Sequence, residues 1–288
     1  MKKGRIRVDN NSLLDFLTFS YFGLTYSELG EKSLEDIAVI CARRAYLDLA
    51  RTLTYKRNNA KETYSQITDA EKDENTSFKA NICVCLGKRV SEFLDGCKPD
   101  NKPSLMKFNE WHDEVCKCIT ACGKNSDALV CRQSNKKERE KFYYGHAQKW
   151  LNMTLKYMTL LNVEEVLNVR DLLHVPIDQY ILKAAAEEKN RGEHSLKKMI
   201  APENHNGDDK ADKLIYFSDG TTQPWSQLNR RDYIDLQEDI RREIIECKKE
   251  KANNWKDISC PLDWESKVWI EQAKLEKEKQ QQKKKEKD

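Results

Sequence analysis

Glycine and proline are scarce in this chain, which has ten glycines and six prolines among 288 residues. Long stretches rich in lysine, glutamate and leucine separate these few helix breakers. Sheet-rich proteins need many more turns, so the composition favours an all-α protein with short connections. A chain of this length can bury a sizeable core and makes one large or two smaller domains.

Long apolar runs and an excess of one charge are also missing. No run reaches the roughly 18 to 20 apolar residues of a membrane span, and the start, MKKGRIRVDNN, lacks the apolar core of a secretory signal. We therefore expect a cytoplasmic protein with no membrane partner. The net charge is +3 with 34% charged residues, so any basic site for nucleic acid has to be local.

Cysteine is plentiful, with ten residues. In a long chain without a secretory signal, they are better explained as reduced thiols than as disulfides. Seven of them fall in one region, at Cys83, Cys85, Cys97, Cys116, Cys118, Cys122 and Cys131. Their spacing lacks the paired C-x2-C of common zinc sites and the usual cluster-binding runs. We predict structural thiols with no metal and no cofactor, and a zinc or iron–sulfur site is the alternative.

Apolar periodicity predicts a series of helices. Residues 78 to 94 repeat apolar side chains at steps of four, which predicts a helix from Ser77 to Leu94. Capping residues predict further helices beginning after Ser33, Ser104 and Ser226 or Asn229. The apolar residues between 13 and 22 are expected in the core, and 214–217 could form a short strand.

The expected organisation is two helical lobes. Residues 1–135 form the first and 136–273 the second, which carries the candidate site and a polar insertion near 187–213. Residues 274–288 have seven lysines against four acidic residues and no aromatic. We expect this tail to be disordered.

Residues 143–184 place polar residues at helical spacing in an apolar setting. Leu151, Leu155 and Met158 predict a helix over 148–161 that buries one face, and Lys149, Asn152 and Lys156 recur on another face. Pro176 disfavours helix at the residue before it, and Asp178 then begins the next helix. A lysine on one helix and an aspartate opening the next are candidates to face each other.

This order of features resembles a known family. Tyr144-Gly145, then Gln148-Lys149 and Lys156, then Val175-Pro176-Ile177-Asp178, resemble the centre of helix-hairpin-helix DNA glycosylases, most closely the archaeal 8-oxoguanine type. The resemblance implies an all-α, two-lobed fold with the site in the cleft between the lobes. It also implies Lys156 as the amine nucleophile and Asp178 as the catalytic carboxylate. The chain departs from the family at the hairpin, where His146 and Ala147 replace the usual second glycine.

The chemistry of base release suits these residue types. Breaking an N-glycosidic bond builds positive charge on the sugar, which Asp178 would stabilise, and the attacking lysine must lose its proton, which a nearby cation such as Lys149 favours. The target base must be flipped out of the duplex into a pocket, for which Tyr157 is a further candidate. The residues expected to bind substrate and DNA are Tyr144, Gly145, His146, Gln148, Lys149, Trp150, Asn152 and Trp225. The predicted function is a DNA glycosylase, with or without lyase activity, in repair or in defence against foreign DNA. DNA is its partner, and no obligate protein partner is inferred.

Two alternatives stay open. Arg139 and His146 loosely fit the R-x4-6-H signature of HEPN-type ribonucleases, which are all-helical and cleave RNA after dimerisation. A non-catalytic helical scaffold is the other. Contact between Lys156 and Asp178 across a cleft would favour the glycosylase, and Arg139 meeting His146 at a two-fold interface would favour the ribonuclease.

Overall fold

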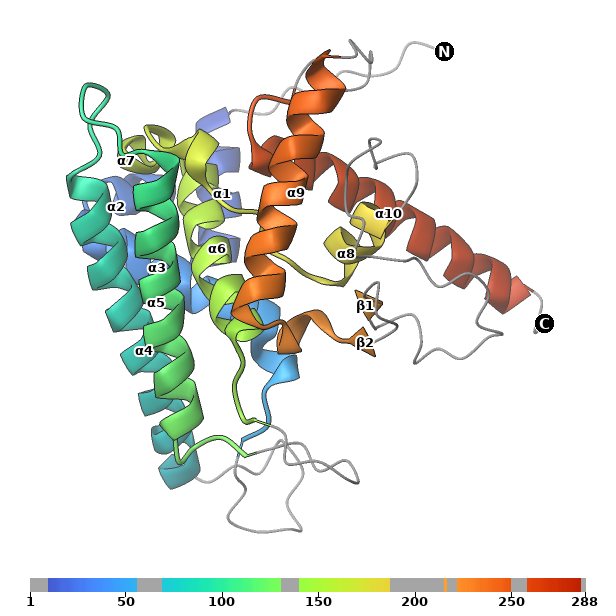
Figure 1. Ribbon diagram of the computed structural model, residues 1–288. Coiled ribbons are helices and arrows are strands. Elements are labelled where there is room, and N and C mark those ends of the chain that lie inside the picture. The colour runs from blue at the N-terminus through green and yellow to red at the C-terminus, as the bar shows by residue number, and fades with distance from the viewer. Residues whose placement is uncertain are drawn as a thin grey trace, which may run out of the picture.

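Most of the residues that the structure describes are in helices (Figure 1). The computed structural model describes residues 10–55, 69–130, 140–186, 215–216, 222–249 and 258–285. In these ranges, the extended structure includes one two-stranded antiparallel ladder, in which β1 (Ile215–Tyr216) pairs with β2 (Thr222–Gln223). The all-α prediction is confirmed, and the polar insertion expected near 187–213 lies outside the described residues.

The elements follow one another along the chain. The α-helices are α1 (Asn10–Phe22), α2 (Tyr26–Gly30), α3 (Leu34–Leu49), α4 (Asp69–Asp95), α5 (Leu105–Asn125), α6 (Tyr144–Leu160), α7 (Glu164–Leu167), α8 (Gln179–Ala186), α9 (Arg230–Lys249) and α10 (Pro261–Lys285). The 3₁₀ turns are η1 (Ala50–Thr52), η3 (Arg170–Leu172) and η6 (Trp225–Gln227).

Local capping explains where several helices begin. The hydroxyls of Ser33 and Ser104 accept the backbone N–H groups of the residues three positions on, at 3.1 and 3.2 Å. Asn229 does the same for α9 at 2.9 Å, and Asp178 for α8 at 3.0 Å. Each side chain satisfies an N–H that the helix itself leaves unpaired. The predicted starts at these four residues are therefore confirmed.

Helix α6 lies at the centre of the fold. It packs against α3 on one side and contacts α5 and α9, between which it lies in Figure 1. The predicted core forms here, with Trp111 partly buried and the others buried: Phe78, Ile82, Leu86, Val90, Phe108 and Val115. The domain boundary expected near residue 135 falls within residues 131–139, which the structure does not describe. Helix α6, which follows this boundary in the sequence, packs on α3 and α5, which precede it. The division into two lobes stays a prediction.

Helix α1 is mostly exposed, so the prediction that the apolar residues between 13 and 22 belong to the core is wrong for most of them. Phe22 packs edge-on against Tyr157, and Thr18 is buried. The remaining large apolar residues face outwards: Leu13, Leu14, Phe16, Leu17, Phe19 and Tyr21. The apolar residues of α1 are spread around the helix, and a helix at the edge of a fold can bury only one of its faces.

The charged tail is also more ordered than its composition predicts. Helix α10 continues to Lys285 instead of ending near residue 273. Lysine, glutamate and glutamine are good helix formers, and 261–285 has no glycine or internal proline. Lys183 of α8 also anchors this helix through Glu276 at 2.6 Å. Across the described ranges, no helix is both long and apolar enough to cross a membrane.

Candidate functional site

An extended segment, 174–178, crosses the centre of the molecule between η3 and α8, and two glutamine side chains hold it. The Gln148 amide donates to the Ile177 carbonyl at 3.0 Å and accepts the Ile177 N–H at 3.2 Å. The Gln237 amide makes the same pair of bonds with Val175, at 2.7 and 2.9 Å. Each amide thus replaces a neighbouring β-strand, satisfying buried backbone groups that lack helix partners. The segment is fixed up to the residue before Asp178.

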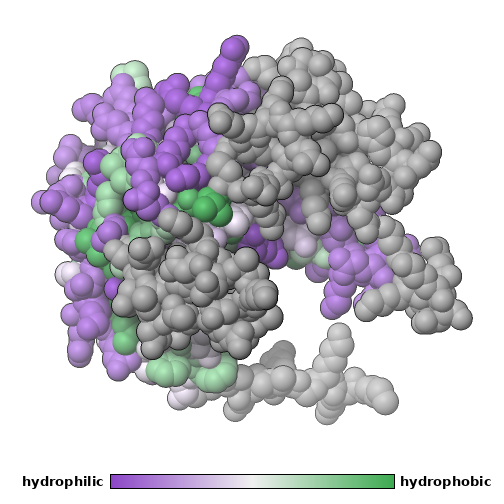
Figure 2. All heavy atoms as spheres, turned by 90° about the horizontal axis from the view of Figure 1, so that it is seen from below, coloured by the Kyte–Doolittle hydropathy of each residue, from purple (hydrophilic) through white to green (hydrophobic). Residues whose placement is uncertain are grey.

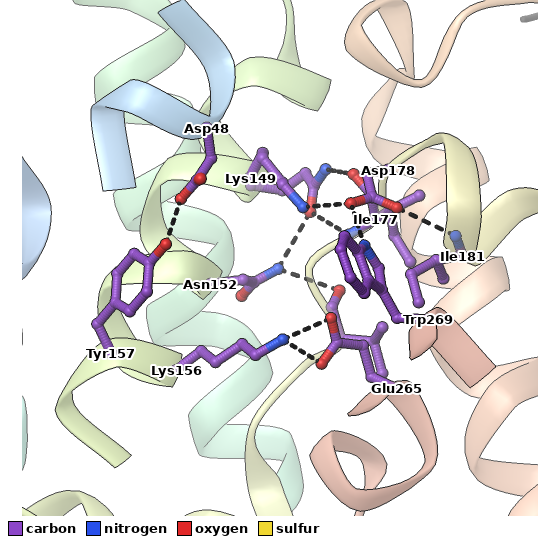
Figure 3. A network of polar contacts seen from close by, with 12 residues as sticks. Asp48, Lys149, Asn152, Lys156, Tyr157, Ile177, Asp178, Ile181, Glu265 and Trp269 are labelled. Carbon is purple, nitrogen blue, oxygen red and sulfur yellow. Dashed lines mark hydrogen bonds and ion pairs between the residues drawn. The ribbon is translucent and has the colours of Figure 1, made fainter. Parts of the chain in front are cut away.

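Asp178 is the last residue of this segment, and its carboxylate lies between α6, α8 and α10 (Figure 3). One carboxylate oxygen caps α8, and the other accepts from Lys149 Nζ at 2.9 Å and from Trp269 Nε1 at 3.2 Å. Burial acts to raise the pKa of Asp178, but Lys149 and the hydrogen bonds from Ile181 and Trp269 outweigh burial and lower it. Asp178 is therefore a carboxylate at neutral pH, in contact with a buried lysine.

Lys156 has a different partner. Its Nζ lies 2.7 Å from Oε1 of Glu265, a buried residue of α10, and also contacts the second carboxylate oxygen (Figure 3). The expected contact between Lys156 and Asp178 is not present, because Lys149, two turns earlier on α6, takes that place. The structure thus contains two lysine–carboxylate pairs from one helix face, and Asp178 belongs to the first.

A chain of neutral polar groups lies behind the site. Asn152 accepts from His112 Nε2 at 2.8 Å and donates to Gln148 and to the Tyr233 hydroxyl. Tyr233 in turn donates to His174 Nδ1 at 2.8 Å. Burial lowers the pKa of His112 to about 4 and that of His174 well below its usual range. Both rings are neutral, and the chain links α5, α6 and α9 through Asn152.

Most residues expected to touch DNA are buried, which corrects that assignment. Gln148 and Asn152 hold the internal network, and the Trp150 indole donates to the Ala42 carbonyl at 2.8 Å inside the core. Tyr144 is buried and donates to Asp113 at 3.2 Å. None of these four side chains can reach DNA in this conformation. Tyr157 is also buried, and its hydroxyl donates to Asp48 at 2.8 Å.

Gly145 has a packing role. Its N–H donates to the Leu228 carbonyl at 2.9 Å, so it is unavailable to a phosphate. An added Cβ would lie 2.3 Å from the Trp225 carbonyl oxygen, which shows that α6 and η6 meet where only glycine fits. Trp225 itself is half-buried in η6. Helix α5 ends at Asn125, and residues 131–139 of the connection to α6 lie outside the described residues, so the hairpin expected from the glycosylase resemblance stays a prediction.

The proposed ribonuclease pair gains no support. His146 is buried in the first turn of α6, where Nδ1 accepts the Tyr143 N–H at 3.0 Å. Burial lowers the pKa of His146 to about 3, so the ring is neutral and withdrawn from any substrate. Arg139 lies outside the described residues.

The thiols that the structure describes divide into buried and surface groups. Cys41, Cys83, Cys97, Cys116 and Cys260 are buried, and burial raises the pKa of Cys83 to about 11. Cys85, Cys118 and Cys122 lie on the outer side of α4 and α5, where Arg89 donates to Cys118 Sγ at 3.6 Å. Cys85 and Arg89 also line a shallow hollow of about 570 Å³ along α4. Among the described residues, no three His, Cys, Asp or Glu side chains are placed to hold a metal ion.

Trp269 is a site residue that the sequence did not reveal. It belongs to α10, 91 positions from Asp178, so no local motif connects the two. Its ring is 36% exposed and lies edge-on against Tyr180 of α8. An aromatic face at the surface next to the Lys149–Asp178 pair suits a planar ligand.

Comparison with known proteins gives no relative, since no family model, curated protein or solved structure matches this chain. A functional proposal therefore rests on the chemistry of the site.

Proposed function

We propose that this protein is a DNA glycosylase in which Lys149 is the amine nucleophile and Asp178 its carboxylate partner. The observation that carries the proposal is the 2.9 Å contact between Lys149 Nζ and Asp178 Oδ2, with only 5% and 18% of the two side chains exposed. Lys149 replaces Lys156 in this role because Glu265 holds the Lys156 ammonium. The resemblance to helix-hairpin-helix glycosylases supports a lysine and an aspartate as the reacting pair, and the contact supports this choice of lysine.

The pair can supply each proton that the reaction needs. The Lys149 ammonium gives a proton to Asp178, and the free amine attacks C1′ of the sugar as the bond from C1′ to the base nitrogen breaks. As that bond breaks, Asp178 passes this proton to the departing base nitrogen, and the carboxylate that it regenerates stabilises the positive charge that develops on the sugar. The covalent product, with Lys149 bonded to C1′, can open to a Schiff base, from which β-elimination nicks the strand.

Asp178 is held in a fixed position, as a group that reacts with a substrate must be. The extended segment is fixed at Val175 and Ile177 by two side-chain amides, and its last residue caps α8. The positive end of the α8 dipole further favours the charged carboxylate. A carboxylate held from three directions loses little entropy when a substrate sugar approaches it.

Substrate entry involves Trp269. Of the described residues that hydrogen bond to Asp178, it is the exposed one, and its displacement would open the pair to a flipped nucleotide. Its ring can then stack on the extruded base, as aromatic side chains do in enzymes that act on flipped bases. The same helix carries Lys274, Lys277 and Lys279 beyond Trp269. These cations suit phosphate contacts along the strand that leads to the site.

Duplex oligonucleotides that each contain one altered base test the proposal. The panel holds 8-oxoguanine, uracil, hypoxanthine or an alkylated purine, and each incubation is followed by hot alkali to reveal abasic sites and by borohydride to trap a covalent adduct. We expect base release and trapping on at least one substrate. Asp178→Asn should abolish base release while keeping the α8 cap.

Two variants on the same helix identify the nucleophile. Lys149→Gln should lose the trapped adduct, and Lys156→Gln, the matched control, should keep it. Trapping lost only with Lys156→Gln would return the nucleophile to that residue. A wild-type protein that acts on no base of the panel and forms no adduct would reject the glycosylase and favour a helical scaffold stabilised by two buried ion pairs.

A further inference from the structure

The exposed face of α1 is the largest concentration of exposed apolar side chains in the described chain. Six of its thirteen residues are exposed large apolar side chains, with Phe16 at 66%, Phe19 at 58% and Leu17 at 52%. Exposed apolar residues elsewhere are distributed over other helices, and the face seen from below in Figure 2 is mainly hydrophilic on the side of α4 and α5. Monomeric proteins rarely leave such a patch uncovered.

The helix is held firmly enough to present this face as a surface. Phe22 and Tyr21 both pack edge-on against Tyr157, and the guanidinium of Arg44 lies 4.3 Å from the centre of the Tyr21 ring. Asp15 accepts the Tyr26 N–H at 3.0 Å and so joins α1 to α2. The exposed side is therefore a fixed ridge of rings and leucines.

The patch extends beyond α1. Leu47 and Leu160 are 59% and 68% exposed and lie three residues after Arg44 and Tyr157, the residues on which Tyr21 rests. Residues three apart share a helix face, so these two leucines lie next to the same patch. An aromatic side chain carries about 150–250 Å² of surface, and the three aromatic residues of α1 are each half to two-thirds exposed. With its three partly exposed leucines, the six α1 side chains together expose roughly 600 Å². With the two leucines, the area approaches the roughly 800 Å² per partner of a stable interface.

We propose that this face binds the same face of a second copy of the chain, forming a two-fold homodimer. The charges favour this occupant. Asp15 is the one charged residue of α1, and its carboxylate is already used within the fold. A face without free charges offers nothing to nucleic acid or a charged peptide, whereas around a two-fold axis it meets an identical apolar face without repulsion.

An anionic lipid surface fits the neighbourhood less well. Helix α2, which packs on α1, carries Glu28, and Glu31 follows it, and both are exposed. These carboxylates would be repelled by anionic headgroups. Lys2, Lys3, Arg5 and Arg7 precede the helix in the sequence, so lipid binding is a measured outcome of the test.

Sedimentation equilibrium of the full chain at micromolar concentrations tests the dimer. We expect a dimer for the wild type and a monomer for the double variant F16D/F19D, because the two carboxylates would meet their copies across the axis. These side chains are exposed, so circular dichroism of the variant should keep the helical spectrum. Met106→Asp is the matched control: an equally exposed apolar residue on α5 whose change should leave the dimer intact.

Three outcomes would overturn the proposal. They are a wild type that stays monomeric at every concentration, a dimer that F16D/F19D leaves intact, and a monomer that co-floats with phosphatidylserine vesicles through Phe16 and Phe19. The dimer does not depend on catalysis. Loss of the dimer in F16D/F19D with base release unchanged would support the surface and leave the glycosylase proposal as it stands.

Discussion

The side-chain amide of Gln148 pairs with both backbone polar groups of Ile177, the residue that precedes Asp178. One side chain on α6 therefore determines where the carboxylate of the site lies. The lysine that contacts this carboxylate is the next residue of α6, so Gln148 and Lys149 fix both members of the pair. The residue that positions the carboxylate and the residue that contacts it are thus neighbours in the sequence.

Replacing Gln148 by leucine should destabilise the protein and its site together. The change leaves the Ile177 N–H and carbonyl buried without partners, and each such group costs about 1–3 kcal/mol. We expect a fall of at least 2 kcal/mol in the free energy of unfolding from urea titration, with unchanged m-value. Gln237→Leu removes the corresponding two bonds of Val175 and should cost less, because the Val175 carbonyl still accepts from the Asn152 amide at 3.4 Å. A loss below about 0.5 kcal/mol in both would show that the clamps contribute little.

The second ion pair makes a separate prediction about stability. Glu265 has 1% of its side chain exposed, so Lys156→Met leaves a buried carboxylate without its cation. Breaking one side of a buried pair costs about 3–5 kcal/mol. The double variant Lys156→Met/Glu265→Gln removes the charge as well and should recover a large part of that loss. If the single and double variants were equally stable, the unpaired charge of Glu265 would not be the cause of the loss in the single variant.

Local features of the fold could be predicted from the sequence. Ser33, Ser104, Asn229 and Asp178 cap helices because a side-chain oxygen reaches an N–H only three residues away. The step-of-four pattern from Phe78 to Leu94 likewise identifies the buried face of α4. Both signals are contained within one or two helical turns.

Pairings between distant elements could not be predicted in this way. Lys149 and Lys156 are two turns apart on one face of α6, so spacing gives both the same direction. The choice between them depends on Glu265, which is 109 positions from Lys156 and reaches it only when α10 packs. Burial of Trp150 and Asn152 likewise depends on α3 and α9. A polar residue on a central helix looks the same in the sequence whether it lines a cleft or an internal network.

The end of α10 should contribute to DNA affinity more than to stability. Residues 279–282 are exposed, and 283–288 add four lysines against two acidic residues. Truncation after Gln282 should leave the melting temperature within about 2 °C of the full chain, because the six residues removed, KKKEKD, include no apolar side chain. Binding to duplex DNA at low salt should weaken, with a shallower dependence of log Kd on log salt concentration. A drop of many degrees would show that this end packs against the body.

Stability should fall between pH 6.5 and 4 because of three buried histidines, His112, His146 and His174. All three rings are neutral in the fold, and the pKa of His112 is lowered from 6.5 to about 4 by burial. Below pH 6.5 the unfolded chain takes up protons that the folded chain refuses, so the free energy of unfolding decreases as the pH falls. Over this window His112 alone should account for about 3 kcal/mol, at 1.36 kcal/mol per pKa unit.

Urea titrations at several pH values measure this slope. His112→Gln, which can still donate to Asn152, should be less stable at pH 7 and show a shallower decrease from pH 6.5 to 4, because one of the three buried histidines that refuse protons is gone. Above pH 7 the free energies of unfolding of the wild type and the variant should run parallel with pH, since His112 is then neutral in both the folded and the unfolded wild type. Equal slopes below pH 6.5 would mean that His112 takes up its proton in the folded protein, and that the hydrogen bonds through Asn152 and Tyr233 do not hold the ring neutral.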